Sequence, residues 1–277
     1  MDATPSGTLH QLLQRLSRRP AVLVRVLDTQ GSAPREAGAW MAVFPDDQLG
    51  TIGGGHLEWE ALVQSRTALA AGKTDGWAQR VALGPSLGQC CGGAMTLGFE
   101  PVDAAHIDRL REQLAPVLTP LALFGGGHVG QAIVRALAPL PFSVHWVDSR
   151  DGVFPADLAP TVVTEHSDPV QAAVNDLAPG TLVLVMSFSH AEDLDIVATC
   201  LQRLRAQDDL PFIGLIGSRT KWATFGRRLK ERGFEDRELE RITCPIGLPG
   251  IAGKEPEVVA ASVVAQLLLV RSGAARR

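Results

Sequence analysis

The sequence predicts an α/β protein in which an N-terminal α+β domain is followed by a Rossmann-like domain with a parallel sheet. The length of 277 residues fits two domains of ordinary size. The second half alternates apolar strand-like runs with helical segments, which is typical of a doubly wound sheet. A glycine loop follows the first of these strands. We place an N-terminal domain at 1–102, a connecting helix or linker at 103–119, and a Rossmann-like domain at 120–277.

The elements of the first domain follow from hydrophobic spacing and from turn residues. Leucines at helical spacing predict an opening helix over residues 7–18. Carboxylates in the first turn support a second helix over 57–71, because they suit the positive end of the helix dipole. Runs rich in β-formers or in alternating residues predict strands at 21–27, 39–44, 77–83 and 94–100.

The elements of the second domain have the rhythm of strand, helix, strand. A connecting helix is expected over 103–116, ending before two prolines. Short apolar runs predict strands at 121–124, 143–147, 161–164, 182–186 and 211–216. Helices are expected between most of these strands, including one at 129–137, and a final helix at 256–270. This order predicts a parallel sheet with helices on its faces.

Composition and charge exclude several classes of protein. Hydrophobic residues make up 45% and charged residues 20% of the chain, as in a globular protein. The net charge of −4 and the pI near 6.0 give no basic footprint for nucleic acid. No apolar run reaches the length of a membrane span, and the N-terminus lacks a secretory pattern. Four cysteines are too few for a disulfide scaffold, so we expect reduced thiols and a cytoplasmic protein.

The glycine loop of the second half has the spacing Gly125-x-Gly127-x-x-Gly130. Asp148 ends the next predicted strand, 18 residues after Gly130, near the separation expected of a dinucleotide fingerprint. Glycines there allow a phosphate to approach the backbone amides at the start of a helix. The alternative is that they only permit close packing of strand and helix. The loop predicts a phosphate site more firmly than it predicts NAD.

A pair of adjacent cysteines, Cys90 and Cys91, lies in the glycine frame Gly88-Gln89-Cys90-Cys91-Gly92-Gly93. They could be two small hydrophobic residues, as single buried cysteines often are. A structural zinc site would need four ligands at paired spacings, and no Cys-x-x-Cys or histidine pair is present. We favour a third hypothesis, a functional thiol that contacts a soft metal or carries sulfur.

Two further segments of the first domain could bind an anion. Gly53, Gly54 and Gly55 lead into a predicted helix that carries Glu58 in its first turn, although the same pattern also suits a tight turn. Arg35 could clamp a phosphate with its planar guanidinium, or it could simply be solvated.

Polar residues follow two strands of the second domain, at the edge where ligands bind in such folds. His190 with Asp193 or Asp195 invites a hydrolase interpretation, but no nucleophile-elbow pattern supplies a serine. A second group opens the helix after the next strand, and it could reach the same cleft: Ser218, Arg219 and Lys221.

Taken together, six segments in this order resemble the xanthine dehydrogenase accessory proteins, the XdhC/CoxI family. The resemblance extends from about residue 10 to 270, and Gln266 stands where we would expect family members to carry glutamate. The segments are Gly31-Ser32-Ala33-Pro34-Arg35, Gly53-Gly54-Gly55-His56-Leu57-Glu58, Gln89-Cys90-Cys91-Gly92-Gly93, Phe124-Gly125-Gly126-Gly127-His128-Val129, Ile216-Gly217-Ser218-Arg219 with Lys221, and Cys244-Pro245-Ile246-Gly247-Leu248.

The resemblance implies a non-catalytic maturation factor that binds molybdenum cofactor, the molybdenum complex of a phosphorylated pterin dithiolene (molybdopterin). Such a factor shields the cofactor, presents it for replacement of an oxo ligand by sulfido, and delivers it to xanthine dehydrogenase. Its implied partners are the apo molybdenum subunit and a NifS-type cysteine desulfurase, and family members are commonly homodimeric. On this resemblance Cys90 and Cys91 would lie near molybdenum, and Gly125 to Gly130 would bind phosphate or a nucleotide.

Two alternatives belong to other functional classes. The first is an NAD(P)-dependent oxidoreductase that uses the Rossmann half, although hydride transfer has no need of the paired cysteines. The second is a nucleotide-sensing binding module that recognises NAD through Asp148. The second alternative predicts affinity for nucleotide without affinity for molybdenum cofactor.

Overall fold

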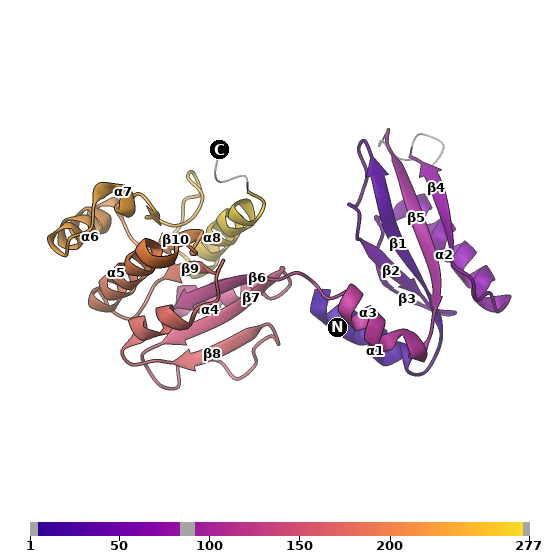
Figure 1. Ribbon diagram of the computed structural model, residues 1–277, viewed down its shortest axis with the longest axis horizontal. Helices are drawn as coiled ribbons and strands as arrows, with labels where there is room; N and C mark the ends of the chain where they lie inside the picture. Colours follow the sequence, from indigo (N-terminus) through magenta and orange to yellow (C-terminus); the bar gives the residue numbers. More distant parts are fainter. Residues whose placement is uncertain (1–4, 84–91, 274–277) are drawn as a thin grey trace. The chain divides into compact units, whose positions relative to one another are not determined.

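A computed structural model describes residues 5–83 and 92–273 of the chain. The chain divides into two compact units, Met1–Pro116 and Val117–Arg277 (Figure 1). The first unit contains an antiparallel sheet and the second a parallel sheet. The predicted α/β class, with a Rossmann-like second half, is therefore confirmed.

The first unit is built on five antiparallel strands in the order β3-β2-β1-β5-β4. Strand β1 is central and pairs with β2 on one side and with β5 on the other, where a bulge lies between Val26 and Asp28. The strands are β1 (Ala21–Gln30), β2 (Trp40–Val43), β3 (Gln48–Gly50), β4 (Trp77–Ala82) and β5 (Ala94–Val102). The helices are α1 (Pro5–Leu16), α2 (Gly55–Ala70), the 3₁₀ turn η2 (Ala104–His106) and α3 (Ile107–Gln113).

Helices cover both faces of this first sheet. Successive residues of a strand point to opposite faces, so Val22 and Val24 pack in the core with α2, while Leu23 packs with α1 and α3. Because both faces are buried, the first half of β1 is a continuous apolar run that does not alternate with polar residues. Helix α3 contributes Leu110 to the core that α1 shares.

The helix expected over 103–116 is shorter and begins differently. The side chain of Asp103 accepts a hydrogen bond from the amide of Ala105, and Nδ1 of His106 accepts one from the amide of Asp103. These local bonds favour a 3₁₀ turn over the first α-helical turn. The α-helical part then covers only Ile107–Gln113.

The second unit has six parallel strands in the order β11-β10-β9-β6-β7-β8. Counted along this unit, the order is 3-2-1-4-5-6 from β8 to β11, which is the order of a dinucleotide-binding Rossmann fold. From β6 to β8 the successive strands are added on one side of β6, and from β9 to β11 they are added on its other side. All strands remain parallel, and a ligand crevice is expected at the carboxyl ends of β6 and β9, where the order switches. The strands are β6 (Thr119–Phe124), β7 (Phe142–Asp148), β8 (Val162–His166), β9 (Leu182–Val185), β10 (Phe212–Leu215) and β11 (Ile242–Thr243).

Helices lie on both faces of the parallel sheet (Figure 1), and each face packs against its own apolar core. Phe124 of β6 packs with residues of α5 and α6, whereas Leu123 packs with residues of α4 and α8 on the opposite face. The helices of this unit are α4 (His128–Leu137), η3 (Val170–Asp176), α5 (His190–Gln207), α6 (Arg219–Glu231), α7 (Asp236–Leu239) and α8 (Pro256–Arg271).

The connection from β8 to β9 is the 3₁₀ segment η3, and a buried arginine of α5 holds it. The guanidinium of Arg203 donates to the carbonyls of Val174 (2.7 Å) and Leu177 (2.6 Å). It also forms two hydrogen bonds with the carboxylate of Asp209, at 3.0 and 2.7 Å. The hydrogen bond from Arg203 holds the pKa of Asp209 below its usual range. Arg203 thereby ties the η3 connection to the helix that follows β9.

The loop after β11 is held against α8. The amide of Gly247 donates to Oε1 of Gln266 (2.8 Å), and the amide of Leu248 donates to Oγ of Ser262 (2.7 Å). An oxygen acceptor at position 266 is what this contact requires, and both glutamine and glutamate supply one. Gln266 therefore serves the loop despite its departure from the expected residue.

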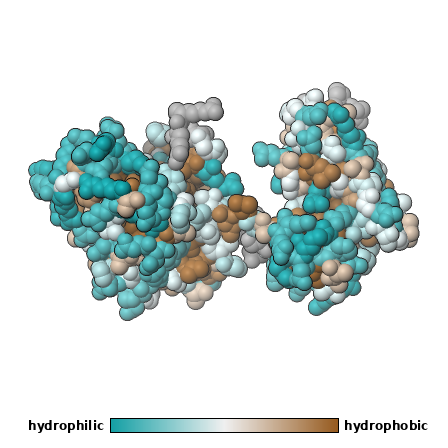
Figure 2. All heavy atoms as spheres, viewed as in Figure 1, coloured by the Kyte–Doolittle hydropathy of each residue, from teal (hydrophilic) through white to brown (hydrophobic). Residues whose placement is uncertain are grey.

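Charged side chains dominate the outer surface near α6 and α7, where the visible face is largely hydrophilic (Figure 2). Exposed ion pairs there include Arg232 with Asp195 and Lys230 with Asp236. Among the helices of residues 5–83 and 92–273, none combines the length and the apolar character needed to cross a membrane.

We expect replacement of Arg203 by methionine to destabilise the protein strongly. The side chain is only 5% exposed, so Arg203→Met leaves a carboxylate and carbonyl oxygens without their donor, at a cost of about 3–5 kcal/mol. Arg232→Met is the matched control, because this arginine is 42% exposed and its ion pair contributes less than about 1 kcal/mol. Urea unfolding followed by circular dichroism measures both. Equal losses in the two variants would contradict the role of Arg203.

Candidate functional site

The glycine loop of the second unit connects β6 to α4, and its glycines differ in their steric surroundings. Gly125 has φ +126°, and a Cβ there would lie 2.0 Å from the carbonyl oxygen of Met186. A Cβ on Gly130 would lie 2.2 Å from the carbonyl oxygen of Gly125, so this glycine permits the close approach of helix and loop. Gly127 has open space around its Cβ position. The loop is therefore tight at its ends and open at Gly127, as a phosphate-binding loop requires.

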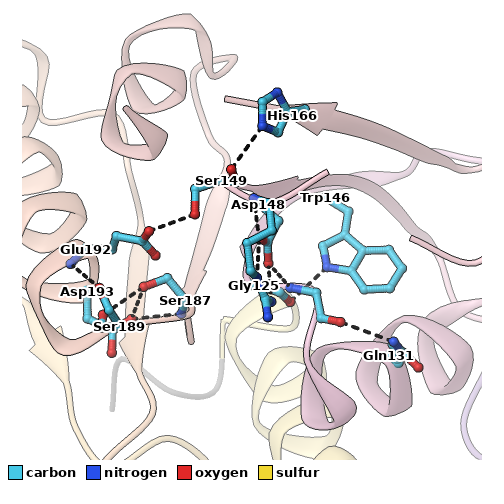
Figure 3. Close-up of polar contacts among 12 residues, drawn as sticks. Gly125, Gln131, Trp146, Asp148, Ser149, His166, Ser187, Ser189, Glu192 and Asp193 are labelled. Carbon is cyan, nitrogen blue, oxygen red and sulfur yellow. Dashed lines mark hydrogen bonds and ion pairs between the residues drawn. The ribbon is translucent and has the colours of Figure 1, made fainter. Parts of the chain in front are cut away.

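Side chains of neighbouring elements fix the carbonyl groups of this loop. The buried indole of Trp146 on β7 donates to the carbonyl of Gly125 (2.9 Å), and Gln131 on α4 donates to the carbonyl of Gly126 (3.2 Å) (Figure 3). With the carbonyls turned toward these donors, the loop cannot rotate freely. It is ordered by contacts within the protein alone.

Asp148, at the end of β7, is the acidic residue of the predicted fingerprint, and its carboxylate is fully engaged inside the protein. Oδ2 accepts from the amide of Gly126 (2.6 Å) and from Nη2 of Arg150 (2.9 Å). Oδ1 accepts from the amide and from Nε of Arg150, both at 2.9 Å. A ribose hydroxyl would have to displace one of these donors. In this structure, Asp148 locks the glycine loop.

The pKa of Asp148 results from opposing effects. Burial of the side chain, which is 1% exposed, raises the pKa. The hydrogen bonds from Arg150 and from the amide of Gly126 more than offset burial, and the pKa lies below its usual value. The carboxylate is therefore charged at neutral pH.

A second buried ion pair lies at the same carboxyl edge, after β9 and β10. Nζ of Lys221 donates to Oδ2 of Asp193 (2.7 Å) and to the carbonyl of Ile216 (2.8 Å). Oδ1 of Asp193 accepts from the amide and the hydroxyl of Ser187, both at 2.8 Å. Ser218 caps α6 by accepting from the amide of Lys221 (3.2 Å). The predicted residues Ser218 and Lys221 thus make structural contacts within the protein: Ser218 caps α6, and Lys221 pairs with Asp193.

The remaining predicted residues of this edge lie at the surface. His190 is exposed at the start of α5, with its ring edge-on to Phe225, and Arg219 is exposed at the start of α6. Asp193 bonds to Ser187 and Lys221, and Asp195 pairs with Arg232. The pairing of His190 with a carboxylate that a hydrolase would need is thus not among the contacts of the described residues.

Three glycine-rich segments of the first unit meet at one end of its sheet. A Cβ on Gly53 would lie 2.8 Å from the ring of Pro34 and 3.5 Å from Cγ of Arg35. A Cβ on Gly93 would lie 2.5 Å from the carbonyl oxygen of Ser32. The segment 31–35 therefore packs directly against both Gly53 and Gly93. Cys90 and Cys91 lie outside the described residues, but Gly93, shortly after them, is packed at this end.

Glu58 on α2 holds the glycine segment that precedes its helix. Its carboxylate accepts from the hydroxyl of Thr51 (2.5 Å), from the amides of Ile52 and Gly54 (both 3.1 Å), and from the side chain of Gln48 (3.0 Å). Burial raises the pKa of Glu58, but these hydrogen bonds more than offset burial, and the pKa lies below its usual value. Glu58 is a structural anchor of the loop, and the neighbouring Gly55 remains exposed.

Sequence patterns did not single out three residues that lie at the carboxyl edge of the parallel sheet. Arg150 holds Asp148, Phe188 is 65% exposed beside it, and Glu192 accepts a hydrogen bond from Ser149 (2.7 Å). The only signal in the sequence is their place directly after strands or in the first turn of a helix. Among the described residues, no cluster of three or more histidine, cysteine or acidic side chains is arranged to hold a metal ion.

The fold and this edge define a class: a two-unit protein whose second unit is a Rossmann fold with a glycine loop between β6 and α4. Comparison with known proteins identifies the family. Residues 121–267 match the family described as the XdhC Rossmann domain, and residues 15–81 match the XdhC and CoxI family. The chain belongs to the XdhC and CoxI family, the accessory proteins that its motifs resemble.

Two relatives illustrate the similarity. The chain is 29% identical to YqeB, an uncharacterized protein of Escherichia coli K12, over 260 residues that make up 92% of this chain and 44% of YqeB. The chain thus spans less than half the length of that relative. A crystal structure described as a xanthine dehydrogenase from Bacillus halodurans matches with a TM-score of 0.78 over 96% of each chain. At 19% identity this match concerns the fold.

We expect Asp148→Asn to lower the free energy of unfolding by about 1–3 kcal/mol at pH 7, because an amide cannot accept from all four donors. The pKa of Asp148 is lowered by folding, so its contribution is complete above the unfolded value of about 3.9 and is lost as the pH falls through the folded value. The difference in free energy of unfolding between wild type and variant is therefore constant above about pH 5 and becomes smaller in stronger acid.

The control for this measurement is Asp151→Asn, since the Asp151 side chain is 92% exposed and its replacement costs less than about 0.5 kcal/mol. Urea unfolding at a series of pH values tests both variants. A difference at Asp148 that grows on acidification would contradict the assignment.

Proposed function

We propose that this protein is a maturation factor for a molybdenum hydroxylase of the xanthine dehydrogenase type, and that it binds molybdenum cofactor. The observation that carries the proposal is family membership across both units. The proposed factor protects the cofactor in the cytoplasm, presents it for exchange of an oxo ligand for sulfido, and delivers it to the apo molybdenum subunit. A NifS-type cysteine desulfurase is the proposed sulfur donor, and a homodimer is the proposed working form.

The residues on the glycine loop fit the phosphate of such a cofactor. The space around Gly127 is open, and α4 begins at His128, so the amides at the start of this helix can face an anion. The carbonyls of Gly125 and Gly126 are bonded to Trp146 and Gln131 and are held away from that role. When bound, the cofactor would supply a soft metal and dithiolene, which suit thiol neighbours. Cys90 and Cys91 are the proposed thiols.

The two alternative functions both require Asp148 to recognise a nucleotide. In an NAD-binding Rossmann fold, the carboxylate at this strand end takes a ribose hydroxyl. Here each oxygen of Asp148 already accepts two hydrogen bonds from the protein. This arrangement disfavours both the oxidoreductase and the nucleotide-sensing module, because each of them needs the carboxylate to recognise ribose. It leaves the phosphate-binding part of the loop unaffected.

We expect the protein to retain molybdenum cofactor under anaerobic conditions, and the Cys90→Ala/Cys91→Ala double variant to retain much less. The protein is mixed with free cofactor and separated from unbound ligand, and molybdenum and pterin are assayed in the protein fraction. Cys200→Ala is the control thiol variant, because Cys200 is fully buried, and burial raises its pKa to about 12. Unchanged retention in the double variant would refute the thiol role. Absence of retention in the wild type, with NAD(H) bound instead, would favour the oxidoreductase or sensor.

We expect two substitutions in the glycine loop to separate binding from folding. Gly127 has φ −71° and open space, so Gly127→Ala should change stability by less than about 1 kcal/mol, yet its methyl group would occupy the proposed phosphate position and reduce cofactor retention. In Gly130→Ala the new Cβ would collide with the carbonyl oxygen of Gly125, which costs about 1–3 kcal/mol. Retention and urea unfolding are measured for both. Full retention by a folded Gly127→Ala protein would place the phosphate elsewhere.

A further inference from the structure

Phe188 is an exposed aromatic side chain at the carboxyl edge of the parallel sheet. It follows β9 directly and is 65% exposed. The guanidinium carbon of Arg150 lies 4.5 Å from the centre of its ring, so one face of the ring is covered by a cation. An exposed aromatic ring at the point where ligands enter such a fold offers its other face for stacking.

Arg150 is held in place and still has donors to offer. Its hydrogen bonds to the carboxylate of Asp148 use Nε and one N–H of Nη2. A guanidinium carries five N–H donors, so those of Nη1 and one of Nη2 are left. The side chain is 36% exposed, and within the described residues these remaining donors have no acceptor. Arg150 is therefore a positively charged side chain of fixed orientation that contacts both Asp148 and the ring of Phe188.

Glu192 completes this edge with an unsatisfied acceptor. Ser149 and Glu192 point toward one another from the end of β7 and the start of α5 (Figure 3), and the Ser149 hydroxyl donates to Oε1 at 2.7 Å. Oε2 of Glu192 is buried and has no hydrogen-bond partner among the described residues. An unpaired buried carboxylate oxygen is costly. The side chain as a whole is only partly buried, so this carboxylate lies near the surface of the edge.

Glu192 also lies close to Arg150. The pKa of the Arg150 guanidinium is raised, first by its hydrogen bond with Asp148 and also by the negative charge of Glu192. Arg150 is thus near both Phe188 and Glu192, and it binds the carboxylate of Asp148, which holds the amide of Gly126 in the glycine loop. The three side chains offer an aromatic face, hydrogen-bond donors for an anion and a carboxylate that lacks a donor.

We propose that Phe188, Arg150 and Glu192 form the ring-recognition half of the ligand site, selective for a phosphorylated 2-amino-4-oxo-pyrimidine ring. Such a ring presents an amino group and an adjacent ring N–H, two donors side by side that a carboxylate can accept. Adenine instead presents a ring nitrogen lone pair at the equivalent edge, which a carboxylate repels. The ring stacks on Phe188, and the phosphate lies toward Arg150 and Gly127. This inference rests on the proposed function for its phosphate position.

Two natural sources carry this ring, a pterin and a guanine nucleotide. Calorimetric titration of the full-length protein compares 6-hydroxymethylpterin phosphate, GMP, AMP and inorganic phosphate. We expect both 2-amino-4-oxo ligands to bind at least about tenfold more tightly than AMP. With adenine the Glu192 carboxylate would face a ring nitrogen lone pair instead of a donor, which costs binding free energy. The tighter of the two ligands identifies the source. Equal affinity for GMP and AMP, or binding of no ring at all, would overturn the proposal.

Variants assign the selectivity to these side chains. Phe188→Ala should weaken every ring-bearing ligand by about 10- to 100-fold through lost stacking and leave inorganic phosphate unchanged. Glu192→Gln should abolish the preference for GMP over AMP. The controls are Val163→Ala, which alters a side chain that is also 65% exposed, and Glu231→Gln on the exposed surface of α6. Selectivity that survives in Glu192→Gln would refute the role of Glu192.

The cofactor-retention assay distinguishes failure of this inference from failure of the proposed function. Retention of molybdenum cofactor without ring selectivity would refute the ring-recognition half alone. Absence of both would refute both. Circular dichroism and thermal unfolding of each variant establish that a loss of binding does not reflect a loss of folding.

Discussion

The organisation of the second unit depends on the carboxylate of Asp148. It lies at the end of β7 and binds the amide of Gly126 in the neighbouring loop, so it joins the ends of two adjacent strands. Arg150 neutralises it, which makes burial of the charge tolerable. Without this charge balance the loop amide would lose its acceptor and the arginine its orientation. The same contacts that order the loop also remove the carboxylate from the task it performs in NAD-binding proteins.

Two buried carboxylates of this edge, Asp148 and Asp193, are each paired with a cation of the protein. Lys221 and Asp193 form a pair that is 13% and 3% exposed, and Ser187 supplies the remaining donors to the carboxylate. Such groups are poorly placed to act as free acids or bases, because each proton transfer would break a buried pair. Glu192 differs from these two carboxylates, since its Oε2 has no partner in the described part of the chain. For the proposed binding role, fixed pairs beside one unsatisfied acceptor favour recognition of a ligand.

The sequence predicted those parts of the molecule that depend on local pattern. Glycine spacing and apolar runs predicted the Rossmann unit, because tight turns and buried parallel strands leave strong local signals. The orientation of Asp148 was beyond such reasoning, since it depends on Arg150 and on the amide of Gly126, 22 residues away. The same is true of Arg203, whose partners Val174 and Asp209 lie on both sides of it in sequence. The predicted roles of Cys90 and Cys91 stay predictions, because these residues lie outside the described ranges.

The two units share one device for shaping a glycine loop. In the first unit Glu58 accepts from the amides of Ile52 and Gly54, and in the second Asp148 accepts from the amide of Gly126. In each case a carboxylate takes some of the loop amides, and exposed or open backbone remains beside them at Gly55 or Gly127. Loops ordered in this way lose little conformational entropy when a ligand arrives. A carrier in the proposed role gains from this, because a preformed loop can bind its cargo with few contacts and release it without refolding.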